Sequence, residues 1–316
     1  MFVNAVIGSE VWMIRPPTVL RPGALRHWHG KGLFCSGKRL GALLLLGGMA
    51  ALSAAPAKAQ NARALLQKCV AAYQSLQSYT GSANVEVSYL YNGRPIQTQA
   101  MKVEMQVKRP NKLLLNFSSP AGSRLIVSDG ANFTVYLPGV RQYNRYPTAP
   151  TLEAMLLPLL FARAGVQAGL DPLYFLSKNR LPDALGSLQL KASTTYNNKP
   201  VYVVTGVTHT KKVTLRDKKG RQAVLPPSTE YWTWWINKRT FLLEKIEAQN
   251  RDIRMNVPVR QGNKIMMRQY PVVRRLRHTV LLVTANPPLA DKVFAFVPPK
   301  DATERKTVQE LLHGSR

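Results

Sequence analysis

Residues 85–108 read VEVSYLYNGRPIQTQAMKVEMQVK, with apolar side chains at every second position on both sides of the Asn92-Gly93 pair. A period of two places such side chains on one face of a β-strand. Asn-Gly is the dipeptide that tight hairpin turns prefer. The stretch therefore predicts an antiparallel hairpin whose second strand, Thr98–Lys108, carries Met101, Val103, Met105 and Val107 on one face.

The same two-residue period continues on both sides of a central interruption. Turn signals such as Ser119-Pro120 and Asp129-Gly130 separate the segments, which favours an antiparallel meander. Lys211–Pro227, rich in Lys, Arg, Gly and Pro, is expected to be a long exposed hairpin or loop. The predicted strands cover residues 113–117, 124–128, 132–137, 187–194, 201–208, 230–237, 241–249, 254–259, 272–283 and 292–296.

Helical spacing occurs in four places. Apolar residues at intervals of three and four predict an amphipathic helix over Ala62–Tyr79. Residues 149–164, APTLEAMLLPLLFARA, predict a helix that is apolar nearly all round and kinked at Pro158. Asp171-Pro172 has the form of an N-cap followed by a first-turn proline, and predicts a short helix to Lys178. A last helix is expected over Thr303–Leu312.

The first 59 residues have the order of a secretory signal peptide. A basic region, Arg15–Arg39, precedes the apolar run Leu40–Ala51, and Ala57-Lys58-Ala59 follows. The alternative is a membrane anchor, but the run has about 12 residues where a span needs about 20. We therefore expect residues 1–59 to be cleaved. Residues 60–316 then form a single exported domain with a helical insertion near 149–178.

The charge of the chain is strongly basic, at +28. From Asn61 onward there are 37 Lys and Arg against 15 Asp and Glu, so about +22 remains after cleavage. Such a charge suggests nucleic acid, anionic membranes or acidic proteins as partners. Because export removes the chain from cytoplasmic nucleic acid, anionic components of the cell envelope are the expected targets.

Residues that carry enzyme chemistry are sparse. His209, His278 and His313 have no metal-ligand spacing, and no nucleophile elbow or phosphate loop occurs after the signal. After cleavage Cys69 is a lone thiol, expected to be a small buried hydrophobe. The sequence thus predicts no cofactor, no metal and no enzyme activity, with a hydrolase as the least favoured alternative.

Large rings occupy both faces of the predicted strand Glu230–Asn237. Tyr231 and Trp235 fall on one face, and Trp232 and Trp234 fall on the other. One interpretation is a core strand covered on both sides. The other is that one face lines a cavity for a hydrophobic ligand, closed by the apolar helix. The residues predicted to line it are Trp232, Trp234, Met155, Leu156, Leu160 and Phe161.

Basic residues crowd the last third of the chain. They are interpreted either as a solvated outer face or as a patch that contacts an anionic surface. The residues predicted to make this contact are Arg251, Arg254, Arg274, Arg275 and Arg277.

Several short motifs together resemble the LolA/LolB-like periplasmic superfamily, and within it a family of predicted periplasmic proteins of unknown function. The motifs are KRPNK at Lys108–Lys112, DG at Asp129-Gly130 before FTVYLP at Phe133–Pro138, WIN at Trp235–Asn237, LEK at Leu243–Lys245, and FAFVPPK at Phe294–Lys300. The resemblance implies a mainly β fold: a curved, incompletely closed antiparallel barrel whose concave side is covered by helices and holds acyl chains. The high charge and the Lys211–Pro227 segment depart from this pattern.

The combined expectation is an exported periplasmic protein that binds a lipid or an acylated lipoprotein and acts by sequestration and transfer. The alternative is an envelope sensor or scaffold that binds a protein partner through the same fold. An anionic membrane surface is a further expected contact.

Overall fold

The computed structural model describes residues 3–7, 10–14, 54–155, 172–176, 185–210, 213–216, 222–225, 228–261 and 264–305. Its helices are α1 (Ala54–Gln74), α3 (Pro172–Leu176) and the 3-10 turns η1 (Pro138–Val140) and η2 (Asp291–Phe294). No helix in these ranges is both long enough and apolar enough to cross a bilayer.

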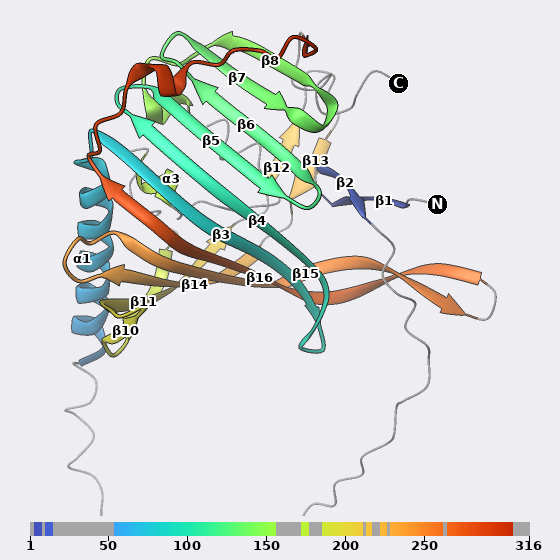
Figure 1. The fold of residues 1–316 in the computed structure, drawn as a ribbon. Helices are drawn as coiled ribbons and strands as arrows, with labels where there is room; N and C mark the ends of the chain where they lie inside the picture. Colours follow the sequence, from blue (N-terminus) through green and yellow to red (C-terminus); the bar gives the residue numbers. More distant parts are fainter. Residues whose placement is uncertain are drawn as a thin grey trace, which may run out of the picture.

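One large sheet dominates the fold (Figure 1). Its first half contains β3 (Ser78–Tyr91), β4 (Arg94–Lys108), β5 (Lys112–Ser119), β6 (Gly122–Ser128), β7 (Asn132–Leu137) and β8 (Gln142–Pro147). Its second half contains β9 (Leu185–Leu190), β10 (Thr194–Tyr196), β11 (Lys199–Thr210), β14 (Ser228–Asn237), β15 (Leu243–Gln261) and β16 (Lys264–Ala285), and β17 (Thr303–Glu304) returns to pair with β8. Two hairpins lie outside this sheet: β1 (Val3–Ile7) with β2 (Glu10–Ile14), and β12 (Val213–Arg216) with β13 (Gln222–Leu225).

The strand order of the large sheet is β10-β11-β14-β15-β16-β3-β4-β5-β6-β7-β8-β17, with β9 also paired to β11. All neighbours are antiparallel except β8 and β17. The sheet curves strongly and its two ends do not pair within the described ranges (Figure 1). The predicted fold class, a curved antiparallel sheet that is not closed into a barrel and carries helices, is confirmed.

The hairpin predicted from residues 85–108 forms with the expected faces. Val85 pairs with Met101 across β3 and β4, and the turn residues Asn92 and Gly93 have φ angles of 49° and 77°. These left-handed angles are the ones that an Asn-Gly hairpin turn requires. The Lys211–Pro227 segment contains the β12–β13 hairpin, as one of its two interpretations expected.

Other predicted bounds are wrong. The first helix ends at Gln74 instead of Tyr79, because Asn286 accepts hydrogen bonds from the backbone of Gln77 and Ser78 and the chain joins the sheet there. Residues 241–249 and 254–259 belong to one strand, β15, with a register shift between Asn250 and Ile253. Residues 292–296 are not a strand but overlap η2, and Thr303 begins β17 rather than a helix. Strand β8 was not predicted.

Helix α1 contains the predicted cleavage point after Ala59, and Ala62 of this helix is buried. Helix α3 begins at Pro172 as predicted. Of the apolar helix predicted over residues 149–164, residues 152–155 are helical. Residues 156–164, and therefore Leu156, Leu160 and Phe161, lie outside the described ranges. So do residues 15–53 of the predicted signal.

The core lies on one face of the sheet, which we call the inner face. It comprises the side chains that pack into one apolar cluster with α1, α3 and residues 152–155. Helix α1 lies against β9 and α3, at the strand ends on the left of Figure 1. Representative members of the inner face are Val85 and Val87 of β3, Leu115 of β5, Trp232 and Trp234 of β14, Ile246 and Ala248 of β15, and Leu276 of β16.

Candidate functional site

The two inner-face tryptophans of β14 belong to the apolar cluster. Trp232 is 3% and Trp234 0% exposed, and their rings stack with centroids 5.8 Å apart and planes 2° apart. Gly206 of β11 pairs with Trp232, and a Cβ there would lie 3.2 Å from Cζ3 of Trp234. The glycine thus leaves the space that the neighbouring indole ring occupies.

The opposite face of β14 has a different character, because its rings lie under cations. Lys245 Nζ lies 4.5 Å from the ring centroid of Trp235, and the guanidinium of Arg251 lies 5.1 Å from that of Tyr231. Such cation–π contacts suit a partly solvated surface. The large rings on both faces of β14 therefore belong to two different surfaces, an apolar inner face and a basic outer face.

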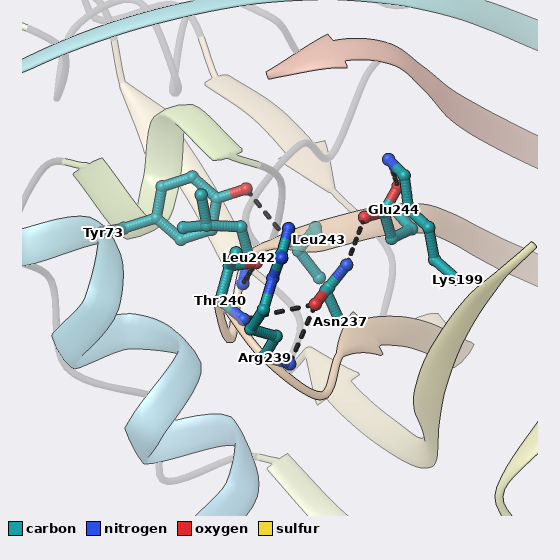
Figure 2. Close-up of polar contacts among 8 residues, drawn as sticks. All are labelled: Tyr73, Lys199, Asn237, Arg239, Thr240, Leu242, Leu243 and Glu244. Atoms are coloured by element: carbon teal, nitrogen blue, oxygen red, sulfur yellow. Dashed lines mark hydrogen bonds and ion pairs between the residues drawn. The ribbon is translucent and has the colours of Figure 1, made fainter. Parts of the chain in front are cut away.

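Helix α1 is attached to the sheet at the turn between β14 and β15 (Figure 2). The backbone N–H of Leu243 donates to the hydroxyl of Tyr73 at 3.2 Å, and burial raises the pKa of that hydroxyl well above its usual value. Below it, Asn237 accepts from the backbone N–H groups of Arg239 and Thr240 and donates to Glu244 at 2.8 Å. This network fixes the turn on which α1 rests, and Lys199 completes it with an ion pair to Glu244 at 2.8 Å.

Arg109, in the turn between β4 and β5, connects three covering segments. Its Nε donates to the carbonyl of Leu76 at 2.8 Å, just after α1. Its Nη2 donates to the carbonyl of Leu176 at the end of α3 at 2.7 Å, and its Nη1 pairs with Glu153 at 3.1 Å. A single guanidinium thus holds the end of the α1 segment, α3 and residues 152–155 together.

Met155 belongs to the same cluster and is buried. Its sulfur accepts a weak hydrogen bond from the hydroxyl of Thr148 at 3.5 Å. Of the six residues predicted to line an apolar site, the structure thus brings Trp232, Trp234 and Met155 into one cluster.

A row of buried polar residues borders this apolar surface. Glu230 pairs with Asn250, which pairs with Arg274, and all three are less than 10% exposed. Arg274 Nη1 lies 3.8 Å from the carboxylate of Glu230, beyond hydrogen-bond distance. Burial raises the pKa of Glu230 to about 7, while the charge of Arg274 and a hydrogen bond from Asn250 lower it.

Three buried nitrogens on the inner face have no hydrogen-bond partner among the described residues. They are Nε1 of Trp234, Nε of Arg274 and Nδ1 of His278. Trp232 differs, because its Nε1 donates to the hydroxyl of Thr208 at 3.0 Å. Burial also lowers the pKa of His278 to about 4, so its ring is neutral at pH 7.

The predicted basic surface is divided between the two faces of the sheet. Arg251 and Arg254 are exposed, and Arg275 is partly buried. Arg277 lies 3.3 Å from Glu247 and 3.8 Å from Glu86, so nearby carboxylates offset its charge. The prediction for Arg274 is corrected, because this residue is buried on the inner face beside Glu230.

The Glu230–Arg274 pair and the Arg109 contacts were missed in the sequence. For Arg274 a signal was present, because it shares its strand face with Val272, Leu276 and Val280, whereas Arg275 and Arg277 do not. Nothing in the sequence marks Arg109 as a connecting residue.

No group of metal-binding side chains occurs in the described part of the chain. Cys69 is buried on α1, and burial raises the pKa of its thiol. A thiol with a raised pKa is a poor nucleophile.

Comparison with protein families finds one match. Residues 62–215 match the family described as "Predicted periplasmic protein (DUF2092)". This confirms the resemblance to a family of predicted periplasmic proteins over that region. A comparison with curated proteins finds no match.

Several solved structures are similar to the chain. A LolA superfamily protein from Nitrosomonas europaea is 15% identical over 74% of this chain and 97% of its own, with a TM-score of 0.29. The lipoprotein LppX of Mycobacterium tuberculosis is 12% identical over 73% and 98%, with a TM-score of 0.36. LprF of Mycobacterium bovis is 11% identical over 77% and 98%, with a TM-score of 0.37.

Proposed function

We propose that this chain, which matches a family of predicted periplasmic proteins over residues 62–215, is an exported binding protein for lipid or lipoprotein acyl chains. It acts by sequestration and transfer, without enzyme chemistry. The observation that carries the proposal is the stacked Trp232–Trp234 pair on the inner face, beneath helices that a few side chains attach to the sheet.

The binding step is the insertion of an acyl chain between the inner face and the covering segments. Trp232, Trp234 and Met155 supply apolar contact, and the sequence predicts the same role for Leu156, Leu160 and Phe161. Each Å² of apolar surface removed from water contributes about 25 cal/mol. Because Arg109 and Tyr73 hold the covering segments by hydrogen bonds, those segments can separate from the sheet without breaking its strand pairing.

The tryptophans of β14 provide the test. All tryptophans after residue 59 lie on this strand: Trp232, Trp234 and Trp235. We expect delipidated protein to take up an acyl chain brominated along its length, and the bromines to quench Trp232 and Trp234 by contact.

Trp235 on the outer face supplies the matched control. Trp235→Phe removes emission that the bromines do not quench, so the quenched fraction of the total tryptophan emission should rise. Trp232→Phe removes emission that they do quench, so this fraction should fall. If the brominated chain neither binds nor quenches, the proposal is wrong.

Export is part of the proposal. Cleavage after Ala59 would leave α1 with residues 60–74, which include Ala62, Leu66, Cys69, Val70 and Tyr73, all of them buried. Intact-mass measurement of protein from the periplasmic fraction should give a chain that begins at Gln60. A full-length mass in that fraction would contradict cleavage.

The alternative, a sensor or scaffold that binds an envelope protein, has one supporting observation. Residues 251–272 of β15 and β16 form a two-stranded ribbon beyond the last pairs with β14 and β3, and it projects from the sheet in Figure 1. We call this ribbon the β15–β16 arm. A single stoichiometric protein captured through the arm, with no lipid retained, would favour this alternative.

A further inference from the structure

Rows of side chains cross the inner face at regular intervals. Trp234, Ile246 and His278 form one row across β14, β15 and β16, and Trp232, Ala248 and Leu276 form the next. Glu230, Asn250 and Arg274 form the third. Rows two residues apart along a strand are separated by about 7 Å. The inner face therefore changes from apolar to charged over a short distance, in the direction away from the α1 attachment.

Arg274 is an unusual residue for this position. Its side chain is 9% exposed, and a guanidinium stays charged at any physiological pH. The carboxylate of Glu230 lies 3.8 Å from its Nη1, and its Nε has no hydrogen-bond partner within the described ranges. A buried N–H of a charged group that lacks an acceptor is costly unless something satisfies it.

The unpartnered groups define the chemistry of what would satisfy them. A guanidinium and an indole N–H are donors only, so both Arg274 and Trp234 require acceptor atoms. The guanidinium fork also matches the two oxygens of a carboxylate or phosphate. The indole lies two rows away, over the apolar surface, where an ester or amide carbonyl of an acyl chain supplies an acceptor.

We propose that Arg274 binds the anionic head group, a carboxylate or phosphate monoester, of an amphiphile whose acyl chain lies along Trp232 and Trp234. This inference rests on the proposed function and adds a head-group class to it. A neutral acyl ester would give the guanidinium of Arg274 no charged acceptor beyond Glu230, so the site prefers anionic amphiphiles over neutral ones.

The neighbouring charges are compatible with such a head group. Burial raises the pKa of Glu230 to about 7, so a proton can neutralise this carboxylate near neutral pH when an anion binds. His278 is neutral at that pH because burial lowers its pKa to about 4. Arg274 is then the charge that the head group meets on this face.

The first test measures the affinity of the wild-type protein for ligands that differ only in their head group. Delipidated protein is titrated with 9,10-dibromostearic acid, with its methyl ester, and with the same chain carrying a phosphate monoester, and tryptophan quenching is followed. We expect at least tenfold tighter binding of one of the anionic chains than of the ester, as expected for a hydrogen bond to a charged group. The preferred anion identifies the head group as carboxylate or phosphate.

The test variant is Arg274→Gln, and the control variant is Arg239→Gln, which removes an exposed guanidinium in the turn between β14 and β15. Arg274→Gln should reduce the affinity for the anionic chain to that of the ester, and Arg239→Gln should leave the tenfold preference intact. The wild-type comparison of ligands stands even if Arg274→Gln fails to fold.

Three outcomes are distinguishable. A preference for an anionic chain that depends on Arg274 supports the inference. Equal binding of acid, phosphate and ester overturns the inference and leaves the proposed function in place. Absence of binding by all three chains overturns both.

Discussion

Gly206 is the residue whose lack of a side chain matters most for the tryptophan pair. A Cβ at this position would lie 2.8 Å from Cδ2 of Leu188 and 3.2 Å from Cζ3 of Trp234. We expect Gly206→Ala to force a shift of these side chains and to lower the free energy of unfolding by about 1–3 kcal/mol. Urea unfolding measures this change.

Gly186 provides the control on the neighbouring strand β9. The nearest atom to a Cβ there is a backbone oxygen at 4.0 Å, so Gly186→Ala should change stability little. Equal effects of the two substitutions would contradict the close packing at Trp234.

Glu230 and His278 have opposite effects on how the free energy of unfolding depends on pH. The folded pKa of Glu230, about 7, lies above its usual 4.5, so its contribution to stability is lost as pH rises through 4.5–7. The folded pKa of His278, about 4, lies below its usual 6.5, so its contribution is lost as pH falls from 6.5 toward 4. In the wild type the two effects on the free energy of unfolding, each about 3 kcal/mol in total, oppose each other between pH 4.5 and 6.5.

Single substitutions should separate the two effects. In Glu230→Gln the free energy of unfolding should rise with pH from 4 to 6.5, because only the His278 effect remains. In His278→Gln it should fall with pH from 4.5 to 7. Urea unfolding at four pH values measures the free energy of unfolding of each variant. If this free energy changed with pH in the same way in both variants, neither residue would have the expected pKa shift.

The sequence predicts which face of a strand a side chain occupies more reliably than it predicts which distant residue that side chain contacts. The alternation of Val85 and Val87, with Asn92-Gly93 after them, was enough to predict the first hairpin, because the period and the turn are local. The placement of Arg274 failed because arginine is rarely buried without a partner. Its partner Glu230 lies across β15, and no local pattern connects the two.

At the scale of elements, tertiary contacts override local patterns near the C-terminus. Residues 292–296 alternate like a strand, yet Asp291 pairs with Lys108 at 2.8 Å and Lys112 at 2.9 Å, at the end of the β4–β5 hairpin. Phe294 is fully buried in the 3-10 turn that results. The candidate site could be predicted only in part for the same reason. The two-residue period places Trp232 and Trp234 on one face of their strand, but the segments that cover them are held by tertiary contacts of Arg109.

Arg109 makes the attachment of the covering segments testable. Arg109→Gln removes charged hydrogen bonds to Leu76 and Leu176 and the ion pair with Glu153. We expect stability to fall by about 2–3 kcal/mol and amide exchange to accelerate in α3. Hydrogen exchange followed by mass spectrometry measures both the extent and the location.

Arg141 is the control for this substitution. It forms an exposed ion pair with Asp301, and exposed pairs contribute about 0–1 kcal/mol. Arg141→Gln should therefore leave exchange in α3 unchanged. Faster exchange spread over the whole sheet in Arg109→Gln would contradict a local role in holding the helices.

At the scale of the whole molecule, positive charge and apolar surface occupy different places. The β15–β16 arm carries the exposed cations Arg251, Arg254 and Arg268, and Met266 and Met267 are exposed on it. The apolar inner face lies within the sheet under α1 and α3. This separation is consistent with one surface for contact with the envelope and another for a ligand.

Salt dependence of vesicle binding tests the arm. We expect the protein to bind vesicles with anionic lipid and to be released at high salt, with about 1 kcal/mol lost for each of Arg251→Gln and Arg254→Gln. A control pair, Arg239→Gln and Lys300→Gln, removes two exposed cations elsewhere. Equal losses for both pairs would assign the attraction to the net charge rather than to the arm.

Native mass spectrometry of protein freshly purified from the periplasm measures whether the inner face binds an acyl ligand. We expect a mass that exceeds the polypeptide by that of a lipid, lost on delipidation and restored by an added acyl chain. A bare polypeptide mass that stays unchanged after incubation with acyl chains would contradict this binding.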